Sequence, residues 1–123
     1  MVVPDEVLQR IKPLSIEKAN EANQYALKNL YGSDNASDKH PTSGNEQDVQ
    51  NWLLSLPIEP TEQVIASWDD ETAVLTNWEV FAKFWDDFCY PASDDVAIWP
   101  LTNNWCLLYG HDEQFEYKRI ATE

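Results

Sequence analysis

The sequence predicts an α+β fold with N-terminal helices, followed by a mostly antiparallel sheet of about five short strands interrupted by one aromatic-rich helix. Apolar residues recur at helical spacing up to residue 57, whereas after residue 62 they alternate in short runs bounded by turn residues. The chain has 123 residues, of which 43% are hydrophobic, enough for the core of one domain. We therefore expect a single domain over residues 1–123, with a helical part at 1–57 and the sheet and aromatic helix at 62–123.

Two helices are predicted before residue 32. Pro4–Glu6 opens a short helix that carries acidic residues in its first turn and ends at Pro13. Ser15 can cap a second helix from Ile16 to about Tyr31, just before Gly32. The apolar residues that share one arc of this second helix, and are expected to face the core, are Ile16, Ala19, Ala26, Leu27 and Leu30.

A polar segment and a third helix follow. Residues 32–45 are predicted to be a long loop that is either mobile or laid over the surface. A helix is then expected from about Glu46 to Leu56, with Pro57 ending it. Its predicted inward-facing residues are Val49, Trp52, Leu53 and Leu56.

Five short strands are predicted in the second half. Residues 62–68 and 72–76 alternate around the turn Asp69-Asp70-Glu71, a pattern typical of a hairpin. Three more strands, at 96–99, 105–109 and 114–120, are joined by short turns and are expected to form an antiparallel meander. We expect Trp99, Trp105 and Tyr109 to share one face of this sheet, which is therefore half exposed.

The aromatic helix is predicted between these two sets of strands. Thr76 and Glu79 match a capping box that begins a helix from about Trp78 to Cys89. Its apolar arc spans roughly 200°, more than one sheet face covers. We expect the N-terminal helices to flank it, the alternative being that its edge at Val80 and Phe84 meets a partner.

Acidic charge is the strongest functional signal. The chain carries 8 Lys and Arg against 22 Asp and Glu, a net charge of −14, and residues 62–123 hold 13 of the acids with only 3 bases. A surface this acidic is repelled by phosphates, so we expect neither a nucleic-acid nor a membrane partner. Because no long apolar run and no signal peptide are evident, we expect a cytoplasmic protein. Cys89 and Cys106 fit reduced, buried thiols, a disulfide between them being the alternative.

Motifs for catalysis are missing. There is no glycine-rich phosphate loop, no Cys-x-x-Cys, no His-Glu-x-x-His and no Gly-x-Ser-x-Gly. His111, Asp112 and Glu113 are adjacent turn residues that point in different directions, and Cys106 lies within an apolar strand, which favours burial over nucleophilic chemistry. We therefore expect no metal, no cofactor and no enzymatic activity.

Acidic residues at the ends of the predicted elements have three interpretations. They form a docking surface for a basic protein, a Mg²⁺ cage of a small hydrolase with Lys83 as the nearby base, or a solvated surface of a housekeeping domain without a charged partner. We favour docking, because aromatic residues accompany the acids. The candidate partner-binding residues are Asp69, Asp70, Glu71, Asp86, Asp87, Asp94, Asp95, Trp99, Asp112 and Glu113.

Two stretches carry a resemblance to known proteins: Ile11-Lys-Pro-Leu-Ser15, and Trp78–Trp85 with Phe88-Cys-Tyr-Pro91 and Ser93-Asp-Asp-Val96. They resemble a family of small acidic bacterial proteins of unknown function. The resemblance covers about half of the chain, includes no catalytic motif, and implies a bacterial cytosolic protein. In its size, acidity and tryptophan content the chain also resembles the immunity proteins of toxin–immunity pairs. This implies an immunity protein or antitoxin that neutralises a basic toxin, such as a nuclease, by occluding its active site.

Overall fold

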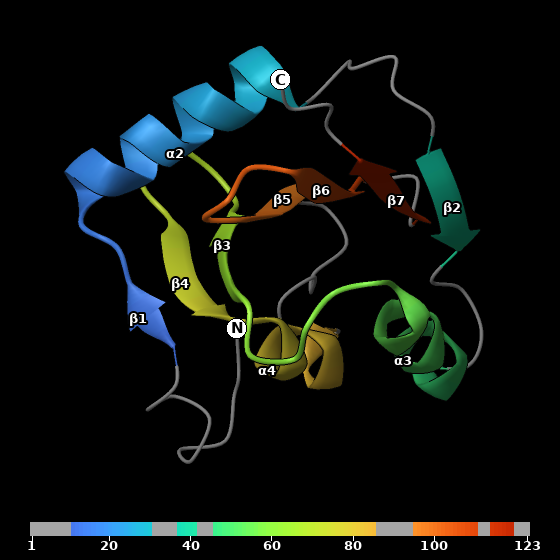
Figure 1. Ribbon diagram of the computed structural model, residues 1–123. Helices are drawn as coiled ribbons and strands as arrows, with labels where there is room; N and C mark the ends of the chain where they lie inside the picture. Colours follow the sequence, from blue (N-terminus) through green and yellow to red (C-terminus); the bar gives the residue numbers. More distant parts are fainter. Residues whose placement is uncertain (1–10, 31–36, 42–45, 86–94, 111–113, 120–123) are drawn as a thin grey trace.

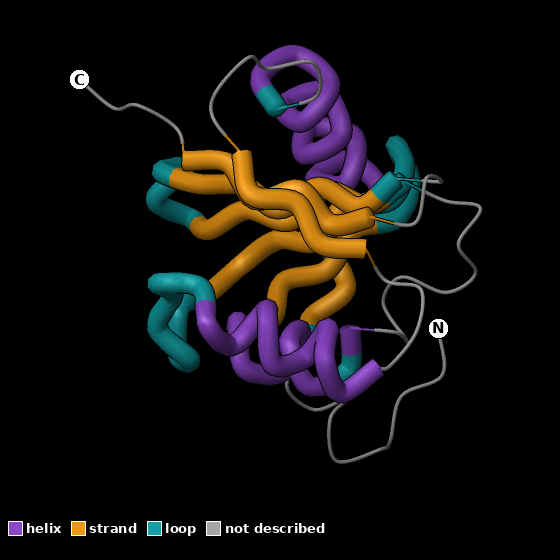
Figure 2. The backbone as a smooth tube through the Cα atoms, turned by 90° about the vertical axis from the view of Figure 1, so that its right-hand side faces the viewer, coloured by secondary structure: helices purple, strands orange, loops and turns teal. Residues whose placement is uncertain are grey.

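The computed structural model describes residues 11–30, 37–41, 46–85, 95–110 and 114–119, which form the predicted α+β fold. Within these residues one antiparallel sheet has the strand order β1-β4-β3-β5-β6-β7-β2, with helices on both of its faces (Figures 1 and 2). The helices are α2 (Ile16–Asn29), α3 (Glu46–Ser55) and α4 (Trp78–Lys83). The strands are β1 (Lys12–Pro13), β2 (Ser37–Pro41), β3 (Gln63–Ser67), β4 (Ala73–Asn77), β5 (Val96–Pro100), β6 (Trp105–Tyr109) and β7 (Gln114–Arg119).

The predicted hairpin and meander are confirmed, and the sheet joins them by pairing β3 with β5. Two further strands close its edges. β2 lies inside the segment predicted to be a loop, because its backbone pairs along the whole of β7. β1 is the first described strand and pairs with β4. Its Pro13 is tolerated because β1 lies at the edge of the sheet. The helix expected before Pro13 lies largely outside the described residues, and Ile11 precedes a strand rather than ending a helix.

Helix α2 covers one face of the sheet through small side chains. Ser15 caps it as predicted, its hydroxyl accepting a hydrogen bond from the Lys18 amide at 3.2 Å. The predicted buried arc is wrong in part, since Ile16 and Leu27 are 66% and 57% exposed. The residues of the core between α2 and the sheet are mostly small: Ala19, Ala22, Ala26, Leu30, Ala73, Ala97, Trp99, Cys106 and Leu108. Alanines on both sides allow the helix and the sheet to approach closely.

A buried hydroxyl in this alanine-rich core is a point of weakness. The Oγ atom of Ser67 is buried and has no hydrogen-bond partner in the structure. An unsatisfied buried polar group is costly, so we expect Ser67→Ala to raise the free energy of unfolding by about 1 kcal/mol. Urea denaturation followed by circular dichroism measures this change. Ser55→Ala is the control, because the exposed Ser55 hydroxyl donates to the Trp52 carbonyl at 2.6 Å; a stability gain in both variants, or in neither, contradicts the prediction.

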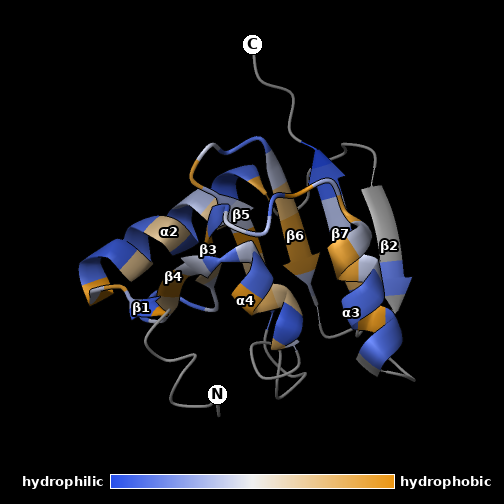
Figure 3. Ribbon diagram, turned by 60° about the horizontal axis from the view of Figure 1, so that its bottom comes forward, coloured by the Kyte–Doolittle hydropathy of each residue, from blue (hydrophilic) through white to orange (hydrophobic). Residues whose placement is uncertain are grey.

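Helices α3 and α4 pack on the opposite face of the sheet. Beneath them lies an aromatic core, whose buried rings are Trp78, Phe81, Trp85, Trp105, Tyr109, Phe115 and Tyr117. Figure 3 shows the two helices side by side against the sheet, so α3 flanks α4 as expected, whereas α2 does not. The cap of α4 is Asn77 rather than the predicted Thr76, since the Asn77 side chain accepts from the Val80 amide at 2.9 Å. Phe84 caps the end of α4, so the helix is shorter than predicted, and the expected terminus at Cys89 lies outside the described residues.

The shared, half-exposed face expected for Trp99, Trp105 and Tyr109 is wrong. All three residues are buried, and they lie on two different faces. Val96 pairs with Tyr109 and Ile98 with Leu107, so the side chains of Val96, Ile98, Trp105, Leu107 and Tyr109 all point towards the aromatic core. Trp99 alternates to the opposite face, where it lies beneath α2.

Candidate partner-binding site

The β3–β4 turn presents three acidic side chains in a defined geometry. Trp68 and Thr72 close the turn, with the Trp68 amide donating to the Thr72 carbonyl at 3.0 Å. Inside it, the Glu71 amide donates to the Asp69 carboxylate at 2.8 Å. Asp69, Asp70 and Glu71 are all exposed, so their charges face solvent from the tip of a regular hairpin.

Sheet register brings a fourth acid to the same end of the sheet. Ser67 of β3 pairs with Ala97 of antiparallel β5, so the residue after β3 and the residue before β5 leave the sheet together. Asp69 and Asp95 therefore lie at the same end of neighbouring strands. We call Asp69, Asp70, Glu71 and Asp95 the acidic end of the sheet.

The other candidate residues fall into two groups. Trp99 is only 3% exposed, because the Tyr25 ring of α2 covers it at a centroid distance of 5.3 Å. It therefore supports α2 from below and presents no free surface to a partner. The remaining candidates, Asp86, Asp87, Asp94, Asp112 and Glu113, lie outside the described residues.

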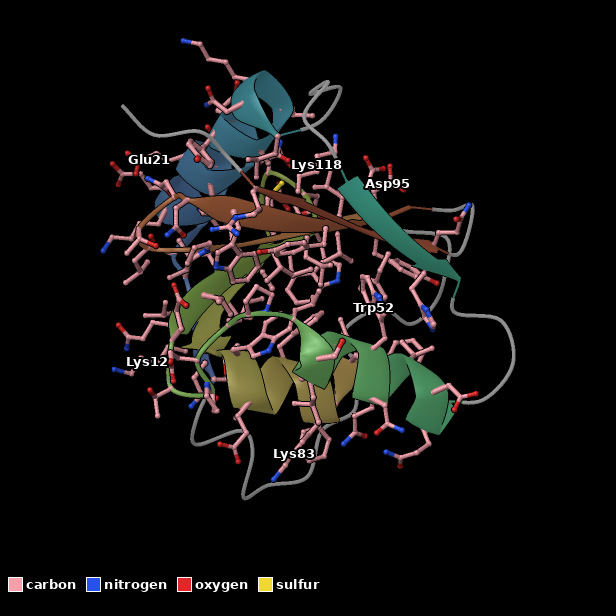
Figure 4. The ribbon with its side chains drawn as sticks, turned by 45° about the vertical axis from the view of Figure 1, so that its right-hand side comes forward. Lys12, Glu21, Trp52, Lys83, Asp95 and Lys118 are labelled. Atoms are coloured by element: carbon pink, nitrogen blue, oxygen red, sulfur yellow. The ribbon has the colours of Figure 1, made fainter. Side chains whose placement is uncertain are left out.

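The acidic end gathers negative charge, but its carboxylates do not surround a common point in the described part of the chain. No group of three or more His, Cys, Asp or Glu side chains there is arranged so that it could hold a metal ion. Lys83, the base considered for a hydrolase, pairs with Glu79 of its own helix at 3.2 Å. Figure 4 places Lys83 below α4 and Asp95 on the other side of the sheet. These side chains can therefore contact a partner as separate surface charges.

Cys106 lies beneath α2, next to a buried cation. Its strand neighbour across β6 and β7 is Lys118, which is buried and pairs with Glu116 at 3.3 Å. Burial raises the pKa of the Cys106 thiol to about 11, although the nearby Lys118 charge acts in the opposite direction. The thiol is therefore protonated at neutral pH, which makes it a poor nucleophile.

This raised pKa predicts a loss of stability at alkaline pH. The unfolded thiol, with its ordinary pKa of 9.0, ionises before the folded thiol at about 11. The contribution of Cys106 is therefore fully present below about pH 9 and is lost as the pH rises towards about 11. We expect the melting temperature to fall over this window, and to fall less in Cys106→Ala. Thermal denaturation of both proteins between these pH values measures the two slopes; equal slopes would falsify the assignment.

Sequence reasoning missed two exposed apolar residues of α2. Ile16 and Leu27 were expected in the core, and the signal that could have reversed this is the run of alanines at positions 19, 22 and 26, which marks the close-packed face. A groove of about 430 Å³ lies along the other side of α2, over Tyr25, Ile65 and Trp99. Helix α2 therefore carries two exposed apolar side chains on one side and borders this groove on the other.

None of the described helices has the length and hydrophobicity needed to cross a bilayer. No known protein family, curated protein or solved structure matches the chain.

Proposed function

We propose that this protein is a non-catalytic acidic binding protein, an immunity protein or antitoxin that neutralises a basic toxin by occluding its active site. The observation that carries the proposal is the acidic end of the sheet, where neighbouring strands present Asp69, Asp70, Glu71 and Asp95 together. The net charge of −14 adds a negative electrostatic potential around the whole molecule, which attracts a basic partner.

The hairpin favours binding because it is already ordered. β3 pairs with β4 on one side and with β5 on the other, so the turn residues extend from the middle of the sheet. A surface that needs no ordering on association loses less conformational entropy when it binds. The acidic end can therefore meet a rigid basic surface without rearrangement.

Occlusion requires only charge and shape from this protein. A nuclease holds the phosphates of its substrate with basic side chains, and carboxylates placed on those side chains block substrate entry. We therefore propose a toxin of the nuclease class as the partner. Long-range attraction between opposite charges raises association rates by about 10- to 1,000-fold at low ionic strength.

Neutralising the hairpin acids tests the proposal. The partner is captured at low salt on the immobilised protein, identified, purified, and assayed for nuclease activity with and without this protein. We expect a basic nuclease that the protein inhibits, and an association rate that falls steeply as salt is added. The variant Asp69→Asn/Asp70→Asn/Glu71→Gln is expected to associate at least about tenfold more slowly at low salt.

A matched control keeps the size of the change constant but moves it elsewhere. Exposed acids lie on α2 at Glu21, on α3 at Asp48 and before β3 at Glu59, so Glu21→Gln/Asp48→Asn/Glu59→Gln removes three charges away from the hairpin. This variant is expected to slow association less than the hairpin variant does. Retention of no basic protein at low salt, or equal slowing by both variants, would remove the acidic end as the docking site.

A further inference from the structure

Two large apolar side chains stand out of one flank of α2. Ile16 and Leu27 are more than half exposed, and their separation of eleven residues is close to three helical turns. They therefore lie on the same flank, about 16 Å apart along the axis. Asn20 and Asn23 lie between them on that flank, so the stripe has apolar ends and an amide-bearing centre.

The direction of this flank follows from the packing of the helix. Ala19, Ala22 and Ala26 face the sheet, and Lys18 and Tyr25 face the groove on one side. The groove is also lined by Leu101, which follows the end of β5, so Ile16 and Leu27 are on the side of the other strand ends, where β3 stops and β5 begins. Figure 4 shows Glu21 and Asp95 on opposite sides of α2.

The stripe therefore starts, at Ile16, beside the acidic end. The pairing of β1 with β4 ends at Leu14, whose amide donates to the Ala73 carbonyl at 2.9 Å. Ile16 begins α2 two residues later. Ala73 itself follows directly on the acidic turn. Leu27 lies three turns further along the same flank, near the end of α2 at Asn29.

We propose that the stripe of Ile16, Asn20, Asn23 and Leu27 is the apolar half of the partner-binding surface. This inference rests on the proposed function and adds to it the chemistry of the partner. The occupant is a basic protein whose contact surface has two apolar side chains about 16 Å apart, as on one face of a helix, flanked by Lys or Arg. Its basic side chains meet the acidic end, and its apolar side chains meet Ile16 and Leu27.

Charge complementarity selects this occupant for the stripe. Charges at the rim of an interface raise the association rate, whereas desolvated apolar contacts slow dissociation and give most of the affinity. The charges of the acidic end can raise the association rate, but they do not by themselves slow dissociation. Ile16 and Leu27 supply apolar contacts within reach of the same partner, and Asn20 and Asn23 can pair with polar groups between the two apolar contacts.

Two synthetic peptides serve as probes of this surface. One is a lysine-rich helical peptide with two leucines separated by the same eleven residues as Ile16 and Leu27, and the other has serines in their place. Both are titrated at low salt into the ¹⁵N-labelled protein and followed by amide chemical shifts. The double variant Ile16→Ser/Leu27→Ser is titrated in the same way. The single variant Leu101→Ser, at an exposed leucine by the groove, is the control for losing an apolar side chain elsewhere.

We expect the leucine peptide to bind at least about tenfold more tightly than the serine peptide, with shifts along the stripe and at the acidic end. The double variant should lose this advantage and Leu101→Ser should keep it. Equal binding of both peptides, or leucine-dependent shifts centred on Tyr25 and Leu101, overturns the stripe while leaving the acidic end intact. Binding of neither peptide at low salt overturns both the stripe and the proposed function.

Discussion

Phe115→Ala is expected to lower the free energy of unfolding by about 3 to 5 kcal/mol, the largest effect of any change considered. Phe115 is fully buried at the centre of the aromatic core. Its ring contacts four others, with centroid distances of 5.1 Å to Tyr109, 5.8 Å to Trp85, 6.2 Å to Phe81 and 6.4 Å to Trp52. These partners come from α3, α4 and β6 or follow directly on α4, so the truncation leaves a cavity that no single element can close.

Urea denaturation followed by far-ultraviolet circular dichroism measures this loss. Because the truncated protein can be too unstable to fold, Phe115→Leu provides a second reading with a smaller loss. Leu54→Ala, at an exposed position of α3, is the control and is expected to change stability by less than about 0.5 kcal/mol. A loss below about 1 kcal/mol in Phe115→Ala, or one no larger than that of the control, shows that the ring is not central to the core.

The same ring links the core to the edge of the sheet. Trp52 lies between Phe115 and His40, and the His40 and Trp52 rings are stacked at a centroid distance of 5.1 Å. His40 belongs to β2 and pairs with Phe115 in the sheet. Helix α3 and the outermost strand are therefore held by one continuous stack of rings.

Strand β2 was not predicted from the sequence, because its residues are polar and its pairing partner is distant in the chain. Residues 37–41 are Ser-Asp-Lys-His-Pro, without the apolar alternation that marks a strand. An edge strand needs only backbone pairing on one side, and charged residues and proline are common there because they discourage further pairing. Its partner β7 lies more than 70 positions later in the chain, so local sequence contains no signal of the pairing.

Local signals succeeded where contacts are local. The turn at Asp69–Glu71 and the meander from Val96 onwards were predicted because short turns dictate which strands pair. The acidic end was partly predictable for the same reason, since acids in turns must lie at the ends of strands. Its completion by Asp95 depends on the pairing of β3 with β5, which a chain separation of about 30 residues hides.

Side-chain direction was harder to predict than element position. Trp99 and Trp105 are both aromatic residues in strands, yet register places Trp99 under α2 and Trp105 in the aromatic core. In α2, hydrophobicity alone favoured burying Ile16 and Leu27. The sheet beneath presents alanines, and only small side chains on the helix allow the two surfaces to meet closely.

Ala19→Leu tests this close approach, and we expect it to lower the free energy of unfolding by about 1 to 3 kcal/mol. Ala19 is fully buried, and it belongs to the same core as Ala73 and Ala97 of the sheet. A longer side chain at this position must push α2 away from the sheet or leave its preferred rotamer. Helix propensity does not explain the loss, because alanine and leucine are both strong helix formers.

Urea denaturation of Ala19→Leu against Leu27→Ala separates packing from propensity. Leu27→Ala exchanges the same two residue types in the same helix at an exposed position, so its stability is expected to change by less than about 0.5 kcal/mol. Since α2 positions Ile16 and Leu27, Ala19→Leu should also weaken binding of the leucine peptide although it alters no residue of the stripe. A variant that keeps full stability would mean that α2 has room above the sheet, and the alanines would then not set its position.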